Sequence, residues 1–185
     1  LLIFGAVKLV GKFGGSGKDK LRKDGIEKLN AGDPEGAIAD LDAALEKAEL
    51  VETLNQGGTF TVFAPTNTAF AEFLSANGFA DLEAVPTPLL KEVLLNHVLN
   101  ARVPSSDVST GYVKTLGKGS ASATNTLSMF INVTDDGVRI NGVANVTAFD
   151  INCNNGVVHV VDDVIGLPTV VTHAVANPNF STLVS

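Results

Sequence analysis

One segment limits the possible folds of this chain of 185 residues more than any other feature: a predicted strand that is apolar on both faces. Residues 156–165, GVVHVVDDVI, place Val157 and Val161 on one side of a strand and Val158 and Val160 on the other. Such a strand is stable only when other elements cover both of its faces. We therefore expect it in the interior of a sheet, with packed layers on either side.

Further strands are expected, because several segments alternate between apolar and polar residues or end in turn residues. Residues 59–64 place Phe60, Val62 and Ala64 on one face. The turn at Asp135-Asp136-Gly137 predicts a hairpin between LSMFINVT and VRIN. The Asn-Gly step in NCNNG joins ANVTAFDIN to the final strand, and GYVKTL is a further strand-like piece.

Amphipathic patterns predict helices before and between these strands. The predicted helices cover about residues 19–30, 36–50 and 86–99, with one more beginning just beyond Pro65. In the second pattern, Leu41, Leu45 and Ala48 lie on one apolar stripe, after Asp33-Pro34 as a start signal. These helices would pack against the sheet.

The segment TFTVFAPTNTAF, residues 59–70, joins a strand to a helix. Thr66 is placed to cap the free N–H groups of the helix start, and Pro65 and Phe70 occupy the two positions of a hydrophobic staple. A second interpretation makes Thr66, Asn67 and Thr68 a polar ligand site at a helix N-terminus, where anions are favoured. We favour the structural role, because capping alone accounts for these residue types.

Charge is distributed unevenly along the chain, whose net charge is −7. Residues 1–23 carry six basic side chains against Asp19 alone, a net +5 that leaves −12 for the remainder. The acidic remainder repels nucleic acid. The opening LLIFGAVKLVGKF is interrupted by Lys8 and Lys12 and falls short of the ~20 residues of a membrane-spanning helix. We expect neither a nucleic-acid partner nor a transmembrane span.

The residue types give little support to metal or catalytic chemistry. A single cysteine, Cys153, excludes an internal disulfide framework and a cysteine-rich metal site. Asp162 and Asp163, adjacent on the final strand, point to opposite faces, which argues against a shared metal site. His159 and Asp162 come without a recognisable nucleophile or substrate pocket, so we expect both to have structural hydrogen-bonding roles.

Two of these segments resemble the sequence boxes of a known family. TFTVFAPTNTAF is similar to the first box of the fasciclin-like (FAS1) domain family, and NGVVHVVDDVIGLP, residues 155–168, is similar to the second. The boxes stand in the family's order and at its separation. The resemblance implies an α+β fold, a wedge of two β-sheets flanked by several α-helices. It also implies an extracellular adhesion or surface-interaction module, with no enzyme chemistry and no cofactor.

Between the boxes, LLNHVLN, residues 94–100, stands where the family usually has a tyrosine–histidine pair. A helical count from Leu89 places His97 within the apolar stripe, so we expect it to be buried and hydrogen-bonded. The same count places Asn96 beside Glu92 on the polar side, so we expect Asn96 to be accessible. The resemblance associates this region with receptor binding in animal members, but asparagine stands here in place of the tyrosine, which weakens the expectation of a receptor partner. Asn96 and His97 are kept as the candidate partner-binding residues.

The resemblance divides the chain into three parts. Residues 1–23 form an apolar and basic N-terminal arm with a glycine-rich hinge, and residues 24–168 form the fasciclin-like domain. Residues 169–185, TVVTHAVANPNFSTLVS, resemble the opening of a following domain, and NPNFSTLVS echoes the earlier DPEGAIADLDAAL. We expect one nearly complete domain, followed by the start of a second one or a tail.

Three functional hypotheses are open. The first is a non-enzymatic extracellular adhesion module, part of a tandem-domain cell-surface protein, that binds surface proteins, glycans or like domains, including copies of itself. The alternative is a structural subunit of an extracellular filament that assembles through the N-terminal arm. The third, a hydrolase that uses His97 or His159, has the weakest support.

The expected location is extracellular or at the cell surface. Asn132, Asn145 and Asn179 each begin a glycosylation acceptor triplet, which has meaning only in a secreted eukaryotic protein. The absence of disulfide pairs favours a bacterial envelope protein instead.

Overall fold

The computed structural model describes residues 43–55, 58–120 and 122–184 of the chain. Its strands are β1 (Phe60–Pro65), β2 (Val98–Leu99), β3 (Gly111–Lys114), β4 (Ser128–Thr134), β5 (Gly137–Ile140), β6 (Ala144–Cys153) and β7 (Gly156–Val161). Its α-helices are residues 43–47, α4 (Val51–Asn55), α5 (Asn67–Ala76), α6 (Thr87–Asn96) and α7 (Val170–Ala176). Short 3₁₀ turns are η1 (Leu82–Ala84), η2 (Ser105–Asp107) and η3 (Pro178–Leu183).

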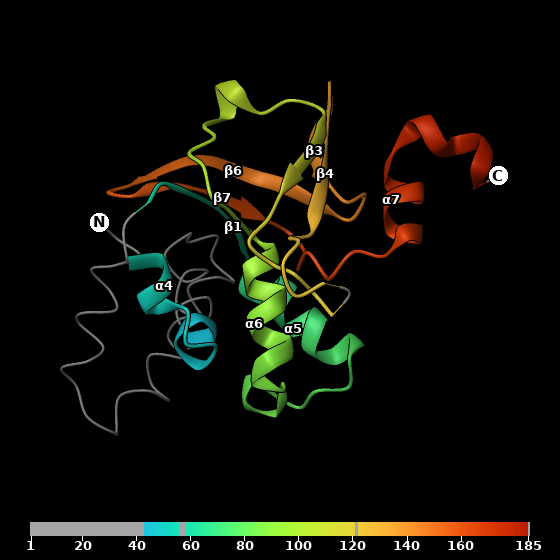
Figure 1. The fold of residues 1–185 in the computed structure, drawn as a ribbon. Helices are drawn as coiled ribbons and strands as arrows, with labels where there is room; N and C mark the ends of the chain where they lie inside the picture. The colour runs from blue at the N-terminus through green and yellow to red at the C-terminus, as the bar shows by residue number, and fades with distance from the viewer. Residues whose placement is uncertain (1–42, 56–57, 121, 185) are drawn as a thin grey trace.

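The strands hydrogen-bond in the order β2-β1-β7-β6-β5-β4-β3. The β1–β7 pair is parallel, and the other neighbouring strands are antiparallel. The β5–β6 ladder holds two register pairs, Arg139 with Asn145 and Ile140 with Ala144, and joins the group β2-β1-β7-β6 to the group β5-β4-β3. Figure 1 shows β3 and β4 crossing the direction of β6 and β7. The expected α+β fold, with two groups of strands flanked by helices, is confirmed.

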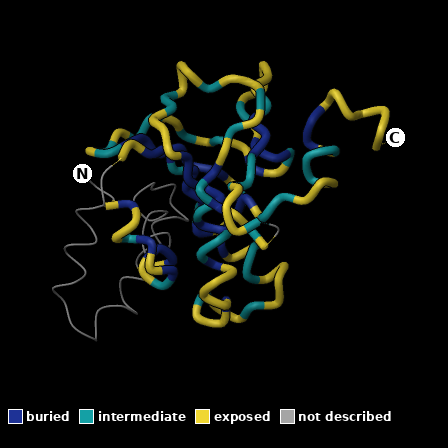
Figure 2. The backbone as a smooth tube through the Cα atoms, in the orientation of Figure 1, coloured by how far each residue is buried: buried dark blue, intermediate teal, exposed yellow. Residues whose placement is uncertain are grey.

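The final strand of the sheet has the position that its two apolar faces predict. β7 lies between β1 and β6, and all six of its residues are buried. Val158 packs in a core cluster with the helices, whereas Val161 packs in a second cluster with Met129 and Ile131 of β4. Figure 2 shows buried residues along the central strands and on the inner sides of the helices.

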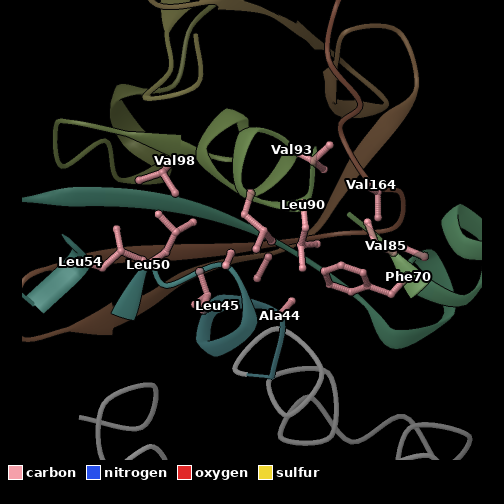
Figure 3. Packing of buried hydrophobic residues seen from close by; sticks show 14 of the residues in the cluster. Ala44, Leu45, Leu50, Leu54, Phe70, Val85, Leu90, Val93, Val98 and Val164 are labelled. Carbon is pink, nitrogen blue, oxygen red and sulfur yellow. The ribbon is translucent and has the colours of Figure 1, made fainter. Parts of the chain in front are cut away.

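The first core cluster lies between the helices and the sheet (Figure 3). Leu90 and Val93 of α6 meet Phe70 of α5 and Leu45 there. Leu45 and Ala48 are buried, as their helical stripe predicts. Leu41, the predicted helix over residues 19–30 and the N-terminal arm lie outside the described residues.

The predicted helix over residues 86–99 extends three residues too far at its C-terminal end. α6 ends at Asn96, because Val98 and Leu99 pair with β1 as the edge strand β2. Residue His97 caps the helix, with its backbone N–H bonded to the carbonyls of Leu94 and Leu95. Among the described residues, no helix is long and apolar enough to cross a membrane.

The two sequence boxes meet through a close backbone approach. The register of β1 and β7 runs from Phe60 opposite Gly156 to Pro65 opposite Val161. A Cβ atom on Gly156 would lie 2.1 Å from the carbonyl oxygen of Phe60. Only glycine leaves room for this approach, so Gly156 is required by the pairing itself.

Candidate functional site at the end of helix α6

Asn96, the last residue of α6, is completely buried, with 0% of its surface exposed. Its Nδ2 donates to the carbonyl oxygens of Ile165 at 3.2 Å and Gly166 at 3.0 Å. Its Oδ1 accepts from the hydroxyl of Thr115 at 3.2 Å. The expectation that Asn96 is accessible was therefore wrong.

The helical count failed because the last turn of α6 is covered on the side that the count assigns to solvent. The backbone N–H of Gly117 donates to the Leu95 carbonyl at 3.1 Å. A Cβ on Gly117 would lie 3.0 Å from the backbone nitrogen of Asn96, so the chain passes closely over this residue. Glu92 on the same side accepts from the N–H groups of Lys118 and Gly119, both at 2.7 Å.

His97 is buried beside Asn96, with 1% of its surface exposed. Its Nδ1 donates to the Val93 carbonyl at 2.8 Å, and its Nε2 accepts from the backbone N–H of Ile165 at 2.9 Å. These two bonds require the neutral imidazole with its proton on Nδ1. Burial lowers the pKa of His97 from its usual 6.5 to about 4, against a smaller opposing effect of the Val93 carbonyl.

Asn96 and His97 together hold the backbone of residues 165–166 against helix α6. Three hydrogen bonds join these two side chains to that segment. Both side chains lie below the surface, so they fix the segment by polar bonds within the protein interior. Their role as partner-binding residues stays a prediction.

Thr66 caps α5 through its side chain. The hydroxyl accepts the backbone N–H of Ala69 at 3.2 Å, and Phe70 is buried in the first core cluster. Thr66 is half-buried, Asn67 is buried and Thr68 is exposed. The hydroxyl of Thr66 is already used within the helix start, which favours the structural role over a ligand site.

His159 is completely buried in β7. Its Nδ1 accepts from the backbone N–H of Asp150 at 3.2 Å, so its Nε2 carries the proton and donates to the Val103 carbonyl at 2.9 Å. The rings of Phe63 and Phe149 lie 5.6 and 5.5 Å from the imidazole, centroid to centroid. Backbone groups thus engage both ring nitrogens and leave neither in position to act as a base.

Asp162 lies just beyond the end of β7, which stops at Val161, so its expected place within the strand was wrong by one residue. Its carboxylate accepts the backbone N–H of Asn145 at 2.7 Å and the Nδ2 of Asn145 at 2.9 Å. These bonds fasten the end of β7 to the start of β6. In the part of the chain that the structure describes, no group of three His, Cys, Asp or Glu residues could hold a metal ion.

A polar contact at the bulged part of β6 was not foreseen from the sequence. Asp150 accepts the backbone N–H of Ser105 at 2.9 Å and also the hydroxyl of Ser105. The hydrogen bonds from Ser105 hold the pKa of the Asp150 carboxyl below its usual range. The backbone φ of Asp150 is 61°, a conformation that a short polar residue tolerates. Nothing in the local pattern FDIN signals this arrangement.

Tyr112 of β3 forms a second unforeseen contact, with α7. The ring of Tyr112 lies edge-on to that of His173, 5.4 Å between centroids, and its hydroxyl accepts from the Nδ2 of Asn177 at 3.2 Å. Burial lowers the pKa of His173. Tyr112 is the only tyrosine of the chain, which is the one sequence signal that could have singled it out.

A cavity of about 200 Å³ lies between the turn before β6, the segment after β7 and α7. Asn141, Asp163 and Thr172 are its polar lining residues, and Val143, Val164 and Leu167 its larger apolar ones. Its volume is below the roughly 300–1,000 Å³ of typical small-molecule sites. The cavity alone therefore assigns no substrate.

The sequence matches the family model of the Fasciclin domain over residues 37–168. Protein sll1483 of Synechocystis sp. is 37% identical over 128 residues, which make up 69% of this chain and 66% of that protein. Periostin of Homo sapiens is 31% identical over 132 residues, 71% of this chain and 15% of periostin. The uncharacterized protein sll1735 of Synechocystis sp. is 33% identical over 128 residues, 69% of this chain and 88% of that protein.

The fold has a counterpart among solved structures. A FAS1 domain pair from the insect cell adhesion molecule Fasciclin I matches 82% of this chain and 53% of its own, with a TM-score of 0.60 and 21% sequence identity. At that identity the likeness shows a shared fold. The family match covers most of the chain and includes both boxes, which the structure pairs as β1 and β7. The chain belongs to the fasciclin domain family.

Proposed function

We propose that this chain is a non-enzymatic adhesion module of an extracellular or cell-surface protein. Family membership over residues 37–168 carries the proposal, because a solved protein with the same fold is the insect cell adhesion molecule Fasciclin I. The proposed partners are surface proteins, glycans or like domains. The proposal includes a place in a bacterial envelope, and two of the relatives are proteins of Synechocystis.

The hydrogen bonding of the polar residues supports a non-enzymatic role. The ring nitrogens of His97 and His159 are all engaged by backbone groups of the protein. The amide of Asn96 bonds to Ile165, Gly166 and Thr115. General acid–base catalysis needs a group that can reach the proton of a substrate, and these side chains are committed to the fold.

A tandem arrangement is part of the proposal. The family match ends at residue 168, and residues 169–185 resemble the opening of a further fasciclin-like domain. The echo between NPNFSTLVS and DPEGAIADLDAAL supports this assignment, since each has proline as its second residue, followed by apolar residues at helical spacing. Within this segment, residues 170–176 form α7 and residues 178–183 form η3.

A binding experiment with the whole chain tests the adhesion role. The chain is immobilised and exposed to intact cells, to a glycan array and to a soluble copy of itself, at low and at high salt. We expect saturable binding to at least one of the three. A matched chain with Gly156→Val, which cannot form the β1–β7 pair, should lose that binding. Absence of binding by the unchanged chain to all three would contradict the proposal.

The alternative function, a subunit of an extracellular filament, is favoured by one feature, the contrast in charge. Residues 1–23 carry a net +5, whereas residues 43–163 carry thirteen acidic against six basic side chains. Oppositely charged parts of neighbouring subunits attract each other. Deletion of residues 1–17 should then abolish assembly and leave folding unchanged. Electron microscopy and circular dichroism measure both, and unaltered assembly after the deletion would exclude the filament model.

A further inference from the structure

The cavity beside the turn before β6 is lined by a buried amide whose nitrogen has no hydrogen-bond acceptor. Asn141, in that turn, is 3% exposed and lines the cavity. Its Oδ1 accepts the backbone N–H of Phe130 at 2.7 Å, whereas its Nδ2 has no partner within the described residues. Leaving a buried N–H group unpaired costs free energy, so this nitrogen indicates a bound partner beyond those residues.

The amide of Asn141 is held in a fixed position. The backbone N–H of Asn141 donates to the Phe130 carbonyl at 2.8 Å, so two bonds join this residue to β4. The backbone φ is 50° at Asn141 and 72° at Gly142, which suits an Asn-Gly turn between two strands. The turn accounts for the backbone and for the side-chain oxygen of Asn141. It does not account for the nitrogen.

The second free polar group of the cavity is the carboxylate of Asp163. This residue follows the end of β7, is half-buried and lines the cavity. In the part of the chain that the structure describes, no hydrogen bond or ion pair engages its carboxylate. Other polar groups of the lining are in use, since the Thr172 hydroxyl bonds to Thr169 and the Gly166 carbonyl to Asn96. A ligand therefore meets one free donor and one free acceptor.

These two groups select the chemistry of the ligand. Asn141 Nδ2 needs an acceptor, and the Asp163 carboxylate needs a donor. An ammonium group only donates, and a carboxylate only accepts and is repelled by Asp163, whereas a hydroxyl does both. Val143, Val164 and Leu167 form an apolar wall against which the C–H groups of a ring can pack. The ligand is therefore an uncharged ring that carries hydroxyl groups.

We propose that this cavity binds one neutral sugar ring, whose hydroxyl groups accept from Asn141 Nδ2 and donate to the Asp163 carboxylate. The inference rests on the proposed function, of which it specifies the glycan partner. The volume of about 200 Å³ equals several water molecules at roughly 30 Å³ each, which suits a single ring and excludes a longer saccharide. Residues 43–163 carry thirteen acidic against six basic side chains, which disfavours an acidic sugar.

An NMR titration of the isotope-labelled 185-residue chain with glucose, galactose and mannose tests the proposal. We expect at least one of these sugars to shift the side-chain NH₂ signals of Asn141 and the backbone amides of residues 163–167 in a saturable way. Glucuronate should shift them less. Asp163→Ala should weaken the binding roughly tenfold, because a hydrogen bond to a charged group is lost.

Asp135→Ala is the matched control. It removes an equal charge from the exposed turn between β4 and β5, at the other end of β5 from Asn141, and should leave sugar binding unchanged. The backbone amide spectrum verifies that both variants are folded. Sugar binding that Asp163→Ala does not weaken would overturn the inference.

Two further probes define the ligand. An oligosaccharide that ends in the sugar that binds separates two sources of the same chemistry. Binding of both assigns the end of a glycan and binding of the monosaccharide alone assigns a free sugar, and either result supports the site. N-methylacetamide carries the N–H and C=O of a peptide. Equal shifts of the Asn141 signals by this amide would overturn the assignment to a sugar.

The inference and the proposed function fail separately. If no sugar shifts the Asn141 signals up to its highest soluble concentration, solvent is the partner of this amide and the inference is overturned. A chain that then still binds cells or copies of itself keeps the adhesion function. Sugar-dependent shifts in a chain that binds neither cells, nor the glycan array, nor itself would support the site and reject adhesion.

Discussion

At the scale of single residues, His97 links the stability of the fold to pH. The folded protein holds it neutral because Nε2 must accept from Ile165, and burial lowers its pKa to about 4. In the unfolded chain the imidazole takes up a proton near pH 6.5. Between these values the unfolded state binds more protons than the folded state. The contribution of neutral His97 to the free energy of unfolding is therefore fully present above about pH 6.5 and is lost as the pH drops toward 4.

We predict that this effect reaches roughly 3 kcal/mol near pH 4, at about 1.4 kcal/mol per pKa unit. Urea unfolding of the unchanged chain at pH 7.5, 6, 5 and 4 measures it. The variant His97→Gln can keep both hydrogen bonds but does not titrate, so its stability should change less over the same range. His159 is present in both proteins, so it does not affect the difference between their pH profiles. Parallel pH profiles of the two proteins would contradict the role given to His97.

Asn96 shows where prediction from residues fails. Its residue type and its angular position on the helix were known from the sequence, and both predicted that Asn96 is exposed to solvent. Its burial depends on two distant segments, residues 115–117 and 165–166, that cover the end of α6. A helical count includes neither segment, because it contains no information on contacts between residues about 20 or 70 positions apart. The burial of His97 was predictable, since the helix's own apolar stripe determines it.

At the scale of the element, the start of α5 depends on one side chain. Thr66→Ala should lower the free energy of unfolding by about 1 kcal/mol, because the backbone N–H of Ala69 loses its acceptor. Thr68→Ala is the matched control, since Thr68 is an exposed residue in the same helical turn and should cost at most about 0.5 kcal/mol. Thermal and urea unfolding measure both variants. Equal losses would show that the hydroxyl of Thr66 is not the cap.

The pairing of β1 with β7 depends on the absence of a side chain at Gly156. Gly156→Ala should destabilise the fold by about 3 kcal/mol or more, because its Cβ would meet the Phe60 carbonyl at 2.1 Å and neither backbone can retreat within the sheet. Gly111→Ala in β3 introduces the same methyl group where no atom lies within 4 Å. That control should remain within about 1 kcal/mol of the parent. A Gly156→Ala protein as stable as the control would refute the close approach.

The elements were largely predictable because each carries its own local signal. The apolar faces of β7 gave its interior position, and turn residues gave the β4–β5 hairpin. The end of α6 was missed, since the apolar run continues through Val98 and Leu99 while the chain changes from helix to strand. In so short an apolar segment, periodicity cannot distinguish a continuing helix from a strand. The pairing of β2 with β1 determines that Val98 and Leu99 form a strand.

At the scale of the whole molecule, the described residues form a body, up to residue 168, and an attached C-terminal arm, residues 169–184, which differ in how much of them is packed. The body is held by two core clusters on the two faces of its sheet, and β7 contributes to both. Ala176 is the one buried residue of α7, and Tyr112 contacts His173 and accepts a hydrogen bond from Asn177, the residue that follows α7. Local opening is easiest where few apolar contacts are buried. The arm should therefore detach without unfolding the body.

Tyr112 offers the means to test this difference. Tyr112→Phe keeps the ring contact with His173 and removes the hydrogen bond from Asn177, so amide exchange in α7 should rise roughly fivefold, the equivalent of about 1 kcal/mol. Tyr112→Ala removes the ring as well, and exchange in α7 should rise further. The amides of β7 should stay protected in Tyr112→Phe. In Tyr112→Ala they should lose a little protection, because the ring that is removed also contacts Phe130. Hydrogen exchange followed residue by residue by NMR measures both regions. If β7 lost protection in step with α7, the arm would be part of one cooperative unit with the body. Protection lost in α7 alone would establish that β3 anchors an arm able to leave the body while the fasciclin core stays folded.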